Sequence, residues 1–319
     1  MKSTIVIPTC NGRHYLERCL KSLEKEDARI VVVDNGSTDG TYELVCDDFP
    51  EIELISFSVN TGFCRAVNAG ILAATTKYVI FLNNDTIVEP GFVRELELVM
   101  EQDKRIFSAS AKMISMQDKS RIDDAGDLYC ALGWAFALGK GKPEKAYQKS
   151  YPVFASCGGA SIYRTKVFEQ IGMLDEKHFA YLEDIDLGYR AQIYGYRNVF
   201  APKARVYHVG SASSGSRYNQ FKTDLSAINS VYLIYKNMPT LQVLLNAPFL
   251  LLGFGIKTLF FMKKGLGKTY LCGLMKGVRF CGQPEARRRR VRYEHRHLWS
   301  YCRIQGMLWW NMLRRFAGR

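Results

Sequence analysis

The sequence predicts an α/β protein built on a doubly wound, mostly parallel sheet. Four short apolar runs alternate with stretches that carry apolar residues at helical spacing, a pattern typical of a parallel sheet with helices on both faces. The runs are residues 5–7, 30–33, 53–57 and 78–82. Polar clusters follow three of them, at 9–12, 34–37 and 83–86. Because right-handed crossovers bring the carboxyl ends of parallel strands to one edge, we expect these clusters to converge there, as a nucleotide site requires.

The second part of the chain continues this alternation less regularly. The predicted elements are a helix at 90–100, a strand at 107–113 and a helix from 183 to 195. Residues 115–150 are expected to be irregular, with exposed aromatic side chains such as Tyr129 and Trp134. This stretch could be an ordinary surface excursion or an acceptor-binding flap.

The cluster Asn83-Asn84-Asp85-Thr86 follows a buried apolar run directly. A lone carboxylate flanked by amide oxygens at a strand's carboxyl end suits a hard divalent cation, which takes oxygen ligands and keeps positions for substrate phosphate. The alternative is an Asx turn that ends the strand. The cluster by itself is compatible with both interpretations.

Two neighbouring acids, Glu183 and Asp184, stand on the first turn of the predicted helix, where the helix dipole stabilises negative charge. Asp186 has a structural explanation, because Arg190 lies four residues later and can pair with it. No such pairing explains the adjacent Glu183 and Asp184. His208 lies in a strand-like run, where a histidine is either structural or a ligand.

The charge of the chain is concentrated at its C-terminus. Residues 257–319 hold 16 Lys and Arg and two Glu, a net charge of +14, whereas the rest holds 28 basic and 29 acidic residues, a net charge of −1. Residues 238–256 are uncharged and mostly apolar but interrupted by Pro239, Asn246, Pro248, Gly253 and Gly255. We therefore divide the chain into a catalytic domain at 1–237 and an apolar, basic, helical region at 238–319.

The C-terminal region favours attachment to a membrane. Basic clusters interleaved with Trp299, Trp309 and Trp310 suit the anionic cytoplasmic face of a bilayer. A solvated basic face is the alternative, and nucleic-acid binding is not expected because no reading motif accompanies the basic run. Nine scattered cysteines without a C-x-x-C pair and the absence of a leader before the first strand favour the cytoplasm.

Seven segments together resemble the family 2 glycosyltransferases with the GT-A fold, a Rossmann-like architecture. They are most similar to the bacterial rhamnosyltransferase branch that builds cell-surface polysaccharide. In chain order the segments are IVIPTCNG (5–12), VVVDNGSTDGT (31–41), NTGFCRAVNAG (60–70), FLNNDT (81–86), CGGASIYR (157–164), FAYLEDIDLGYRAQIYGYR (179–197) and VYHVG (206–210). Each segment alone is weak evidence, but seven in family order are strong. The resemblance covers roughly residues 3–215.

The resemblance implies a nucleotide-sugar site and names its residues. Those expected to hold the nucleotide-sugar are Pro8, Thr9, Asn11, Asp34, Ser37, Asn60, Gly62, Arg65, Asn68 and Asn84. Asp34 would bond the pyrimidine ring. Those expected to support the acceptor or its loop are Gly158, Gly159, Glu183 and Trp134.

The resemblance also implies the chemistry. Asp85 would bind Mg²⁺ or Mn²⁺ at the family's D-x-D position, where this chain has Asn83 in place of the first acid, and His208 would be a second ligand. Asp184 matches the general base of the inverting members. No second carboxylate suited to act as a nucleophile is evident, which favours a single inverting displacement.

The branch resemblance suggests dTDP-L-rhamnose as donor, and UDP-glucose, UDP-galactose or UDP-N-acetylglucosamine are the alternatives. The expected acceptor is a glycan or a polyprenyl-linked glycan, and the expected location is the inner face of the cell membrane. An alternative of another class is a non-catalytic scaffold of a polysaccharide-assembly complex. The presence of Asp85, Asp184 and His208 together argues against it, since a scaffold needs none of them.

Overall fold

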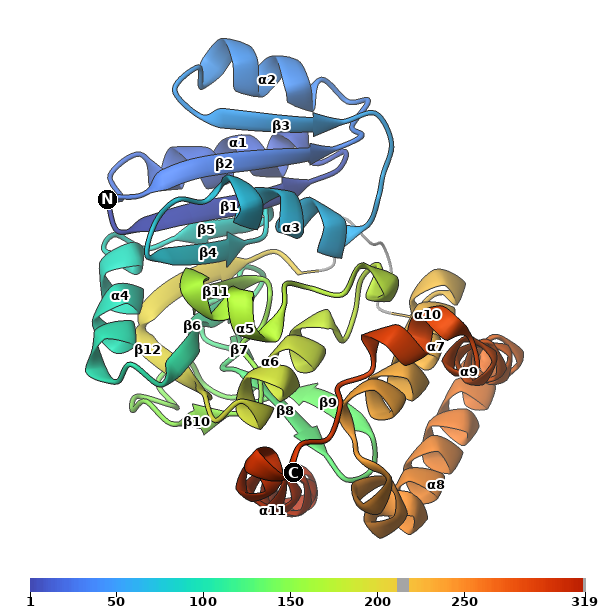
Figure 1. The fold of residues 1–319 in the computed structure, drawn as a ribbon. Helices are drawn as coiled ribbons and strands as arrows, with labels where there is room; N and C mark the ends of the chain where they lie inside the picture. Colours follow the sequence, from blue (N-terminus) through green and yellow to red (C-terminus); the bar gives the residue numbers. More distant parts are fainter. Residues whose placement is uncertain (211–217, 318–319) are drawn as a thin grey trace.

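A mixed sheet of ten strands runs through the described part of the protein, and helices cover both of its faces (Figure 1). The computed structural model describes residues 1–210 and 218–317. The strand order is β10-β12-β6-β11-β4-β1-β2-β3, with β5 paired to β12 and β7 paired to β6. The mostly parallel α/β architecture predicted from the sequence is confirmed.

The N-terminal half of the sheet is parallel. Its strands are β1 (Ser3–Thr9), β2 (Arg29–Asn35), β3 (Glu53–Phe57) and β4 (Tyr78–Leu82). The order β3-β2-β1-β4 is the first half of the classic dinucleotide-fold order, and Thr9 pairs with Asp34 at the carboxyl edge. The three polar clusters therefore do meet at one edge of the sheet.

The C-terminal half of the sheet is mixed. Its strands are β5 (Thr86–Val88), β6 (Ile106–Ser115), β10 (Pro152–Val153), β11 (Ala160–Arg164) and β12 (Arg197–His208). The antiparallel strand β11 joins the two halves by pairing with β4 on one side and β6 on the other. Strand β12 pairs with β5 so that His208 faces Thr86 in the register, which brings His208 next to the Asn83–Thr86 cluster.

Two hydrophobic cores form on opposite faces of the sheet. One face packs α1, α2 and α4, and the other packs α3, α5 and α6. The bounds are α1 (Arg13–Leu23), α2 (Thr41–Asp48), α3 (Phe63–Ala73), α4 (Phe92–Gln102), α5 (Phe168–Ile171) and α6 (Glu183–Ile193). Alternate residues of each strand supply the two cores, as in Ile5 and Ile7 on one face and Val6 on the other.

Residues 115–150 are more ordered than the sequence suggested. They contain β7 (Ile122–Asp124) and the hairpin strands β8 (Asp127–Cys130) and β9 (Trp134–Ala137). The expectation of exposed aromatic residues was wrong for Tyr129, which is fully buried against Phe154 and Tyr189. Trp134 is half-buried, and its indole donates a hydrogen bond of 3.0 Å to the carbonyl of Gly253. The partners of these two rings lie 25 to 119 residues away in the chain, so the local sequence gave no sign of them.

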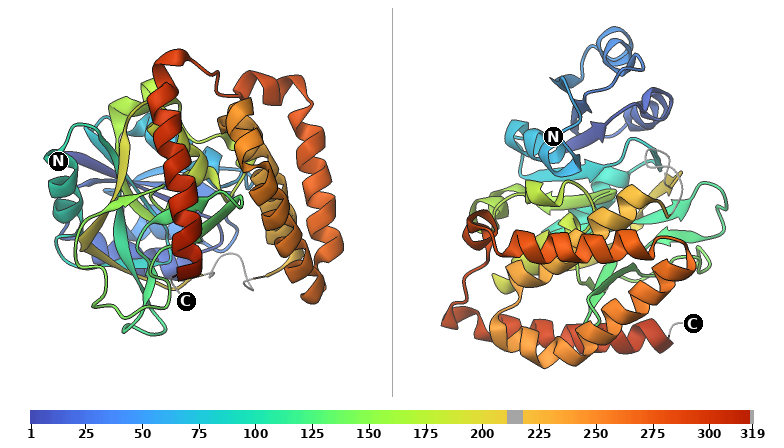
Figure 2. Two further views of the ribbon diagram at one scale, coloured as in Figure 1. Left: turned by 90° about the horizontal axis from the view of Figure 1, so that it is seen from below. Right: turned by 90° about the vertical axis from the view of Figure 1, so that its right-hand side faces the viewer.

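In the described residues five helices follow the sheet, and Figure 2 shows α8, α9 and α11 gathered on the side away from β1, β2 and β3. The bounds are α7 (Gln220–Asn237), α8 (Thr240–Lys263), α9 (Gly267–Cys281), α10 (Pro284–Arg289) and α11 (Leu298–Ala317). Of the residues expected to interrupt 238–256, Pro239 lies in the break between α7 and α8, whereas α8 continues through all the others, Pro248 included. A Cβ at Gly253 would overlap the Leu132 carbonyl, so this glycine permits α8 to lie directly against the 130–134 turn.

The division of the chain at residue 237 remains a prediction. The helices α8 and α11 share one hydrophobic core with Tyr129, Phe154 and Tyr189 of the preceding part. Backbone contact reinforces this packing, since the Ala131 amide donates to the Leu308 carbonyl at 3.1 Å.

A buried ion network fastens α7 to the start of α6. The Lys236 ammonium lies 2.7 Å from Asp175 and 2.9 Å from Asp186, and Arg190 pairs with Asp186 at 2.8 Å. Arg289 of α10 bonds the other oxygen of Asp175 at 2.8 Å. Burial alone would raise the pKa of Asp175, but the charge of Lys236 outweighs it and lowers this pKa to about 2. The expected Asp186–Arg190 pair is therefore part of a larger cluster.

Replacing the central cation should destabilise the protein strongly. In Lys236→Met, two buried carboxylates lose their shared partner, and removing one member of a buried ion pair costs about 3–5 kcal/mol. The matched control is Lys276→Met, which breaks a half-exposed pair with Asp224 and should cost at most about 1 kcal/mol. Urea unfolding of both variants measures the difference. Equal costs would show that Arg190, Arg289 and Asn237 replace Lys236 fully.

Candidate active site

A cavity of about 460 Å³ opens at the carboxyl edge of β1, β2 and β4. Its other walls are the 157–159 turn and residues 179–184 that lead into α6. Ten of the residues singled out from the sequence line it: Pro8, Thr9, Asn60, Asn84, Asp85, Gly158, Gly159, Glu183, Asp184 and His208. Residues from six separate segments thus meet around one hollow, which is the size of a small-molecule site.

Asn35 organises the end of this cavity beside β2, although sequence analysis did not single it out. Its side-chain oxygen accepts from the amide and hydroxyl of Thr61 at 2.8 and 2.9 Å. Its nitrogen donates to Asn60 at 3.1 Å and to the Gly62 carbonyl at 3.2 Å. One buried amide therefore holds the 60–62 turn against the end of β2. Its place directly after Asp34, within the polar cluster, was the available signal.

Asn11, Asp34 and Ser37 lie beside the cavity and not in its lining. Asp34 accepts from the Ser37 amide at 3.0 Å, and Ser37 in turn accepts from the Asn11 amide at 2.9 Å. Asn11 accepts from the Thr38 amide at 2.8 Å. These bonds join the first and second polar clusters into one surface next to Cys10, which does line the cavity.

Four other predicted residues also lie outside this lining. Gly62 has a φ of +92°, and a Cβ there would approach the Phe179 ring to 2.6 Å, so it permits the close contact of two cavity walls. Asn68 is buried and bonds the Leu174 backbone through both of its side-chain polar atoms. Arg65 is exposed over the Phe57 ring. Trp134 lies under α8, as described above.

The two expected metal ligands face each other across the cavity wall. His208 Nε2 lies 3.3 Å from Asp85 Oδ1, and Asp123 fixes the imidazole by contacting Nδ1 at 2.8 Å. Burial alone would lower the pKa of His208, but its bonds to Asp123 and Asp85 raise it to about 9. An imidazole nitrogen and a carboxylate oxygen, with a second carboxylate behind the imidazole, form a donor set that fits Mn²⁺ or Mg²⁺.

Asp184 stands at the opposite wall, at the start of α6. Its carboxylate accepts from the Ile185 amide at 2.7 Å and also from the Gly158 amide. The neighbouring Gly159 carbonyl accepts from the Asn83 amide at 2.8 Å. The Gly158-Gly159 turn therefore connects Asp184, through backbone hydrogen bonds, to the Asn83–Asp85 segment on the other side of the cavity.

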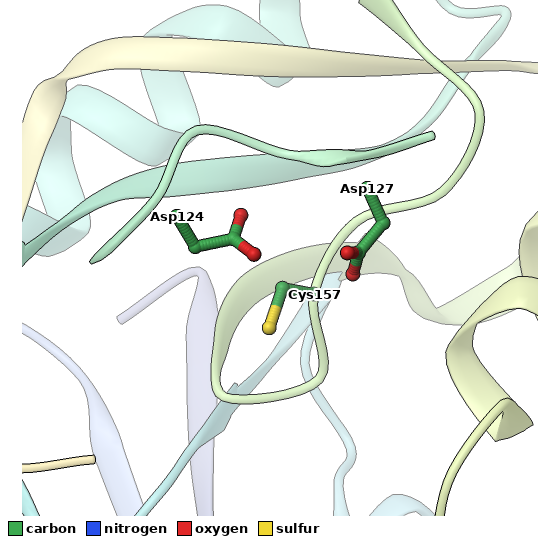
Figure 3. A group of neighbouring side chains, drawn as sticks. All are labelled: Asp124, Asp127 and Cys157. Carbon is green, nitrogen blue, oxygen red and sulfur yellow. The ribbon is translucent and has the colours of Figure 1, made fainter. Parts of the chain in front are cut away.

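A cluster of acids that sequence analysis missed lies behind Asp184. Figure 3 shows the side chains of Asp124, Asp127 and Cys157 pointing toward one another, and their ligand-capable atoms lie within 4.8 Å. Burial raises the pKa of Asp124 to about 7 and that of Asp127 well above its usual range. Asp127 is hydrogen-bonded to Asp184, which raises the pKa of Asp127 and lowers that of Asp184. This hydrogen bond therefore favours the protonated form of Asp127 and the ionised form of Asp184.

Glu183 differs from its neighbour in its surroundings. Burial raises its pKa to about 8, and the charge of Asp184 adds to the effect. Its Oε2 atom is buried without a hydrogen-bond partner in the described residues. At neutral pH Glu183 is therefore mainly protonated, which leaves Asp184 as the better proton acceptor of the two.

The segment before these acids is strained. Phe179, Tyr181 and Leu182 all have positive φ, at 58°, 70° and 68°. Asn229 of α7 stabilises this conformation by donating to the carbonyls of His178, Ala180 and Tyr181 at 2.8–2.9 Å. The segment is thus held from α7, and it aims the first turn of α6 at the cavity.

Taken with the sheet order, these features define a nucleotide-binding α/β fold with an acidic, metal-suited site at its carboxyl edge. The family profile described as Glycosyl transferase family 2 matches residues 4–172. The chain belongs to this family, and the resemblance seen in the sequence is confirmed.

Relatives and solved structures agree with this assignment. The chain is 27% identical over 239 residues to the N-acetylglucosaminyl-diphospho-decaprenol L-rhamnosyltransferase of Mycobacterium tuberculosis, covering 66% of this chain and 77% of the relative. Residues 1–349 of S. aureus TarS, solved with UDP-GlcNAc, superpose with a TM-score of 0.61 at 18% identity over 91% of this chain and 84% of that one. GalNAc-T7, solved with UDP, GalNAc and Mn²⁺, gives 0.61 at 17% identity over 74% of this chain and 48% of that one. The similarity to these two structures shows the fold of the chain, and this fold is the GT-A fold predicted from the sequence.

The contact between Asp123 and His208 leads to a test on metal binding. In Asp123→Ala the imidazole loses the group that fixes its orientation, and loss of such a partner typically weakens metal binding 10–100-fold. Asp118→Ala, an exposed acid of the same segment, should leave binding unchanged. Titration of free Mn²⁺ by electron paramagnetic resonance measures both. Equal affinities in the wild-type protein and Asp123→Ala would show that Asp123 does not orient the ligand.

Proposed function

We propose that this chain is an inverting, metal-dependent glycosyltransferase that moves a sugar from a nucleotide-sugar to a hydroxyl group of a glycan acceptor. The observation that carries the proposal is the cavity that Asp85 and His208 line at one wall and Asp184 at another. A nucleotide diphosphate on the first wall would present its sugar to the second. This arrangement separates the leaving group from the base, as a single displacement requires.

Asp85 and His208 would hold the cation, with Asp123 keeping the imidazole in place. When bound, Mg²⁺ or Mn²⁺ neutralises the charge that grows on the departing nucleoside diphosphate. Asn35 and Asn60 form the ribose end of the cavity, and the carboxyl end of β1 closes it beside Cys10. These residues orient the donor and exclude water from its diphosphate.

Asp184 would take the proton from the acceptor hydroxyl as that oxygen attacks the anomeric carbon. Burial raises its pKa, which makes it a stronger base than an exposed carboxylate, while the bonds from Ile185 and Gly158 limit that rise. The protonated Asp127 bonds the same carboxylate and fixes its orientation. Glu183, which burial keeps mainly protonated, lies beside Asp184 as an uncharged part of the cavity lining.

The proposed donor is dTDP-L-rhamnose, and the proposed acceptor is a sugar joined through a diphosphate to a polyprenyl lipid. The mycobacterial relative, whose name specifies L-rhamnose and an N-acetylglucosaminyl-diphospho-decaprenol acceptor, supports both. The UDP-sugars remain the alternative donors. We place the reaction at the cytoplasmic face of the membrane.

A donor panel with the purified chain tests the proposal. We expect sugar transfer and nucleoside diphosphate release to be fastest with dTDP-L-rhamnose and to stop in EDTA, with recovery on adding Mn²⁺. Asp184→Asn keeps the shape of the base and should lower transfer at least ~10²-fold, as expected for a lost general base. The variant should fold normally and still bind nucleoside diphosphate. Glu183→Gln should lose less, because Glu183 is already protonated.

Each arm of this experiment can contradict one part of the proposal. Full activity in EDTA would exclude the metal-dependent mechanism. Faster transfer from a UDP-sugar would replace the donor but keep the reaction. An inactive Glu183→Gln beside a fully active Asp184→Asn would show that the base is Glu183.

We also propose that α8, α9 and α11 attach the enzyme to an anionic membrane surface. Helix α8 is long and apolar enough to cross a membrane. Only 17% of the residues in its most apolar stretch are buried, although a single such helix is weak evidence of a membrane span. Its exposed side chains include Leu251 at 75% and Leu259 at 62%, and Trp310 of α11 is 61% exposed. An apolar face of this kind, next to a region of net charge +14, complements anionic lipid better than water or an acidic protein.

Substitutions on the exposed face of α8 test this attachment without removing helices that share the core. Leu251→Glu with Leu259→Glu should greatly reduce sedimentation with phosphatidylglycerol vesicles, since both residues would face the lipid. The matched control is Leu72→Glu, at a 73% exposed position on α3. High salt should weaken wild-type binding, because each basic residue near such a surface contributes about 1 kcal/mol. Equal vesicle binding by all three proteins would remove the proposal.

A further inference from the structure

A second cavity, of about 370 Å³, lies between the start of α6, α7 and α8. It shares Tyr181, Glu183, Asp184 and Lys222 with the donor cavity, so the two hollows meet at the proposed base. The far wall is formed by α8, whose outer side is the apolar face described above. A molecule in this cavity would thus have one end at Asp184 and the other beside the exposed helix.

The lining of the second cavity is suited to an anion. Lys222 and Lys257 both contribute to it, and α7 adds the hydroxyl groups of Thr223, Ser226 and Ser230. Its acids are the same two that line the donor cavity, Glu183 and Asp184, and Glu183 is mainly protonated. The second cavity therefore combines two lysine side chains with the hydroxyl of Thr223, while the hydroxyls of Ser226 and Ser230 donate to carbonyls of their own helix.

Lys257 has no counter-ion in the described residues. Lys257 is half-buried, and no acid of the described residues lies within ion-pair distance of its ammonium, whereas the buried Lys236 has two such partners. Burial lowers the pKa of Lys257 to about 8, with only the Cys130 thiol opposing the change. A cation held in such surroundings is stabilised by a bound anion, which would restore its ordinary pKa.

We propose that the second cavity is the acceptor site and that Lys257, together with Lys222, binds the diphosphate that joins the acceptor sugar to its isoprenoid lipid. The proposal rests on the proposed function and adds the residues that recognise the acceptor. In this arrangement the acceptor sugar reaches Asp184, the diphosphate lies between α7 and α8, and the lipid continues along the apolar face of α8. The enzyme then recognises the linkage between sugar and lipid as well as the sugar.

Binding of farnesyl diphosphate to the full chain tests the site without requiring transfer. The measurement is made by calorimetry in EDTA, so that no cation draws the diphosphate to Asp85 and His208. We expect the wild-type protein to bind farnesyl diphosphate, and inorganic diphosphate to bind more weakly because it lacks the isoprenoid. Lys257→Gln should weaken binding about tenfold or more, as loss of a charged hydrogen bond does. Lys257→Arg should retain most of the affinity, and Lys263→Gln, an exposed lysine of the same helix, should retain all of it.

Kinetics give a second, independent measurement. In Lys257→Gln the KM for a polyprenyl-diphosphate-linked acceptor should rise by a similar factor, while the KM for the donor stays unchanged. A purely structural role would instead lower the melting temperature and change both constants together, and that result would overturn the proposal. Unchanged farnesyl diphosphate binding in Lys257→Gln, or binding lost in Asp85→Asn instead, would also overturn it. Failure of every donor in the panel would contradict the proposed function, and the farnesyl diphosphate experiment would still report on the anion site.

Discussion

The arrangement of the site depends on one buried ammonium, that of Lys236, which two carboxylates share. Asp175 precedes the strained 178–182 segment and Asp186 follows it, so the lysine fixes both ends of that segment to α7. Asn229, on the same face of α7, then bonds three carbonyls within it. Because Glu183 and Asp184 come next, a helix that lies outside the sheet sets the direction of the proposed base.

The helical region at 238–319 also helps to position the proposed base. Helix α10 contributes Arg289 to Asp175, so part of the basic run at 287–290 serves the interior. Arg290 lies over the Tyr235 ring of α7, at 5.1 Å. The proposed membrane contact therefore relies on other cations of the region, whereas α7 and α10 hold the active-site segment.

The sheet, its order and the convergence of the polar clusters could be predicted because each depends on local pattern and on the hand of crossovers. Asp85, His208 and Asp184 were singled out by the resemblance to the family, and the structure brings all three to one cavity, but their roles stay predictions. Asp123, Asp127 and Asn229 could not be predicted, because their roles come from pairings across 48 to 85 residues. The burial of Tyr129 could not be predicted for a related reason, since the rings that cover it belong to other segments of the chain.

The pairing of β5 with β12 has a consequence for how the site comes into being. Asp85 and His208 are separated by more than a hundred residues, and they become neighbours only when the last strand of the sheet adds to the edge of β5. The Val209 amide then donates to the Asp85 carbonyl at 3.0 Å and closes the pair. A ribosome that has made only the segment matched by the family profile, residues 4–172, has produced Asp85 without His208. The proposed cation site can thus form only in the late, long-range stage of assembly, where chain closure is slowest.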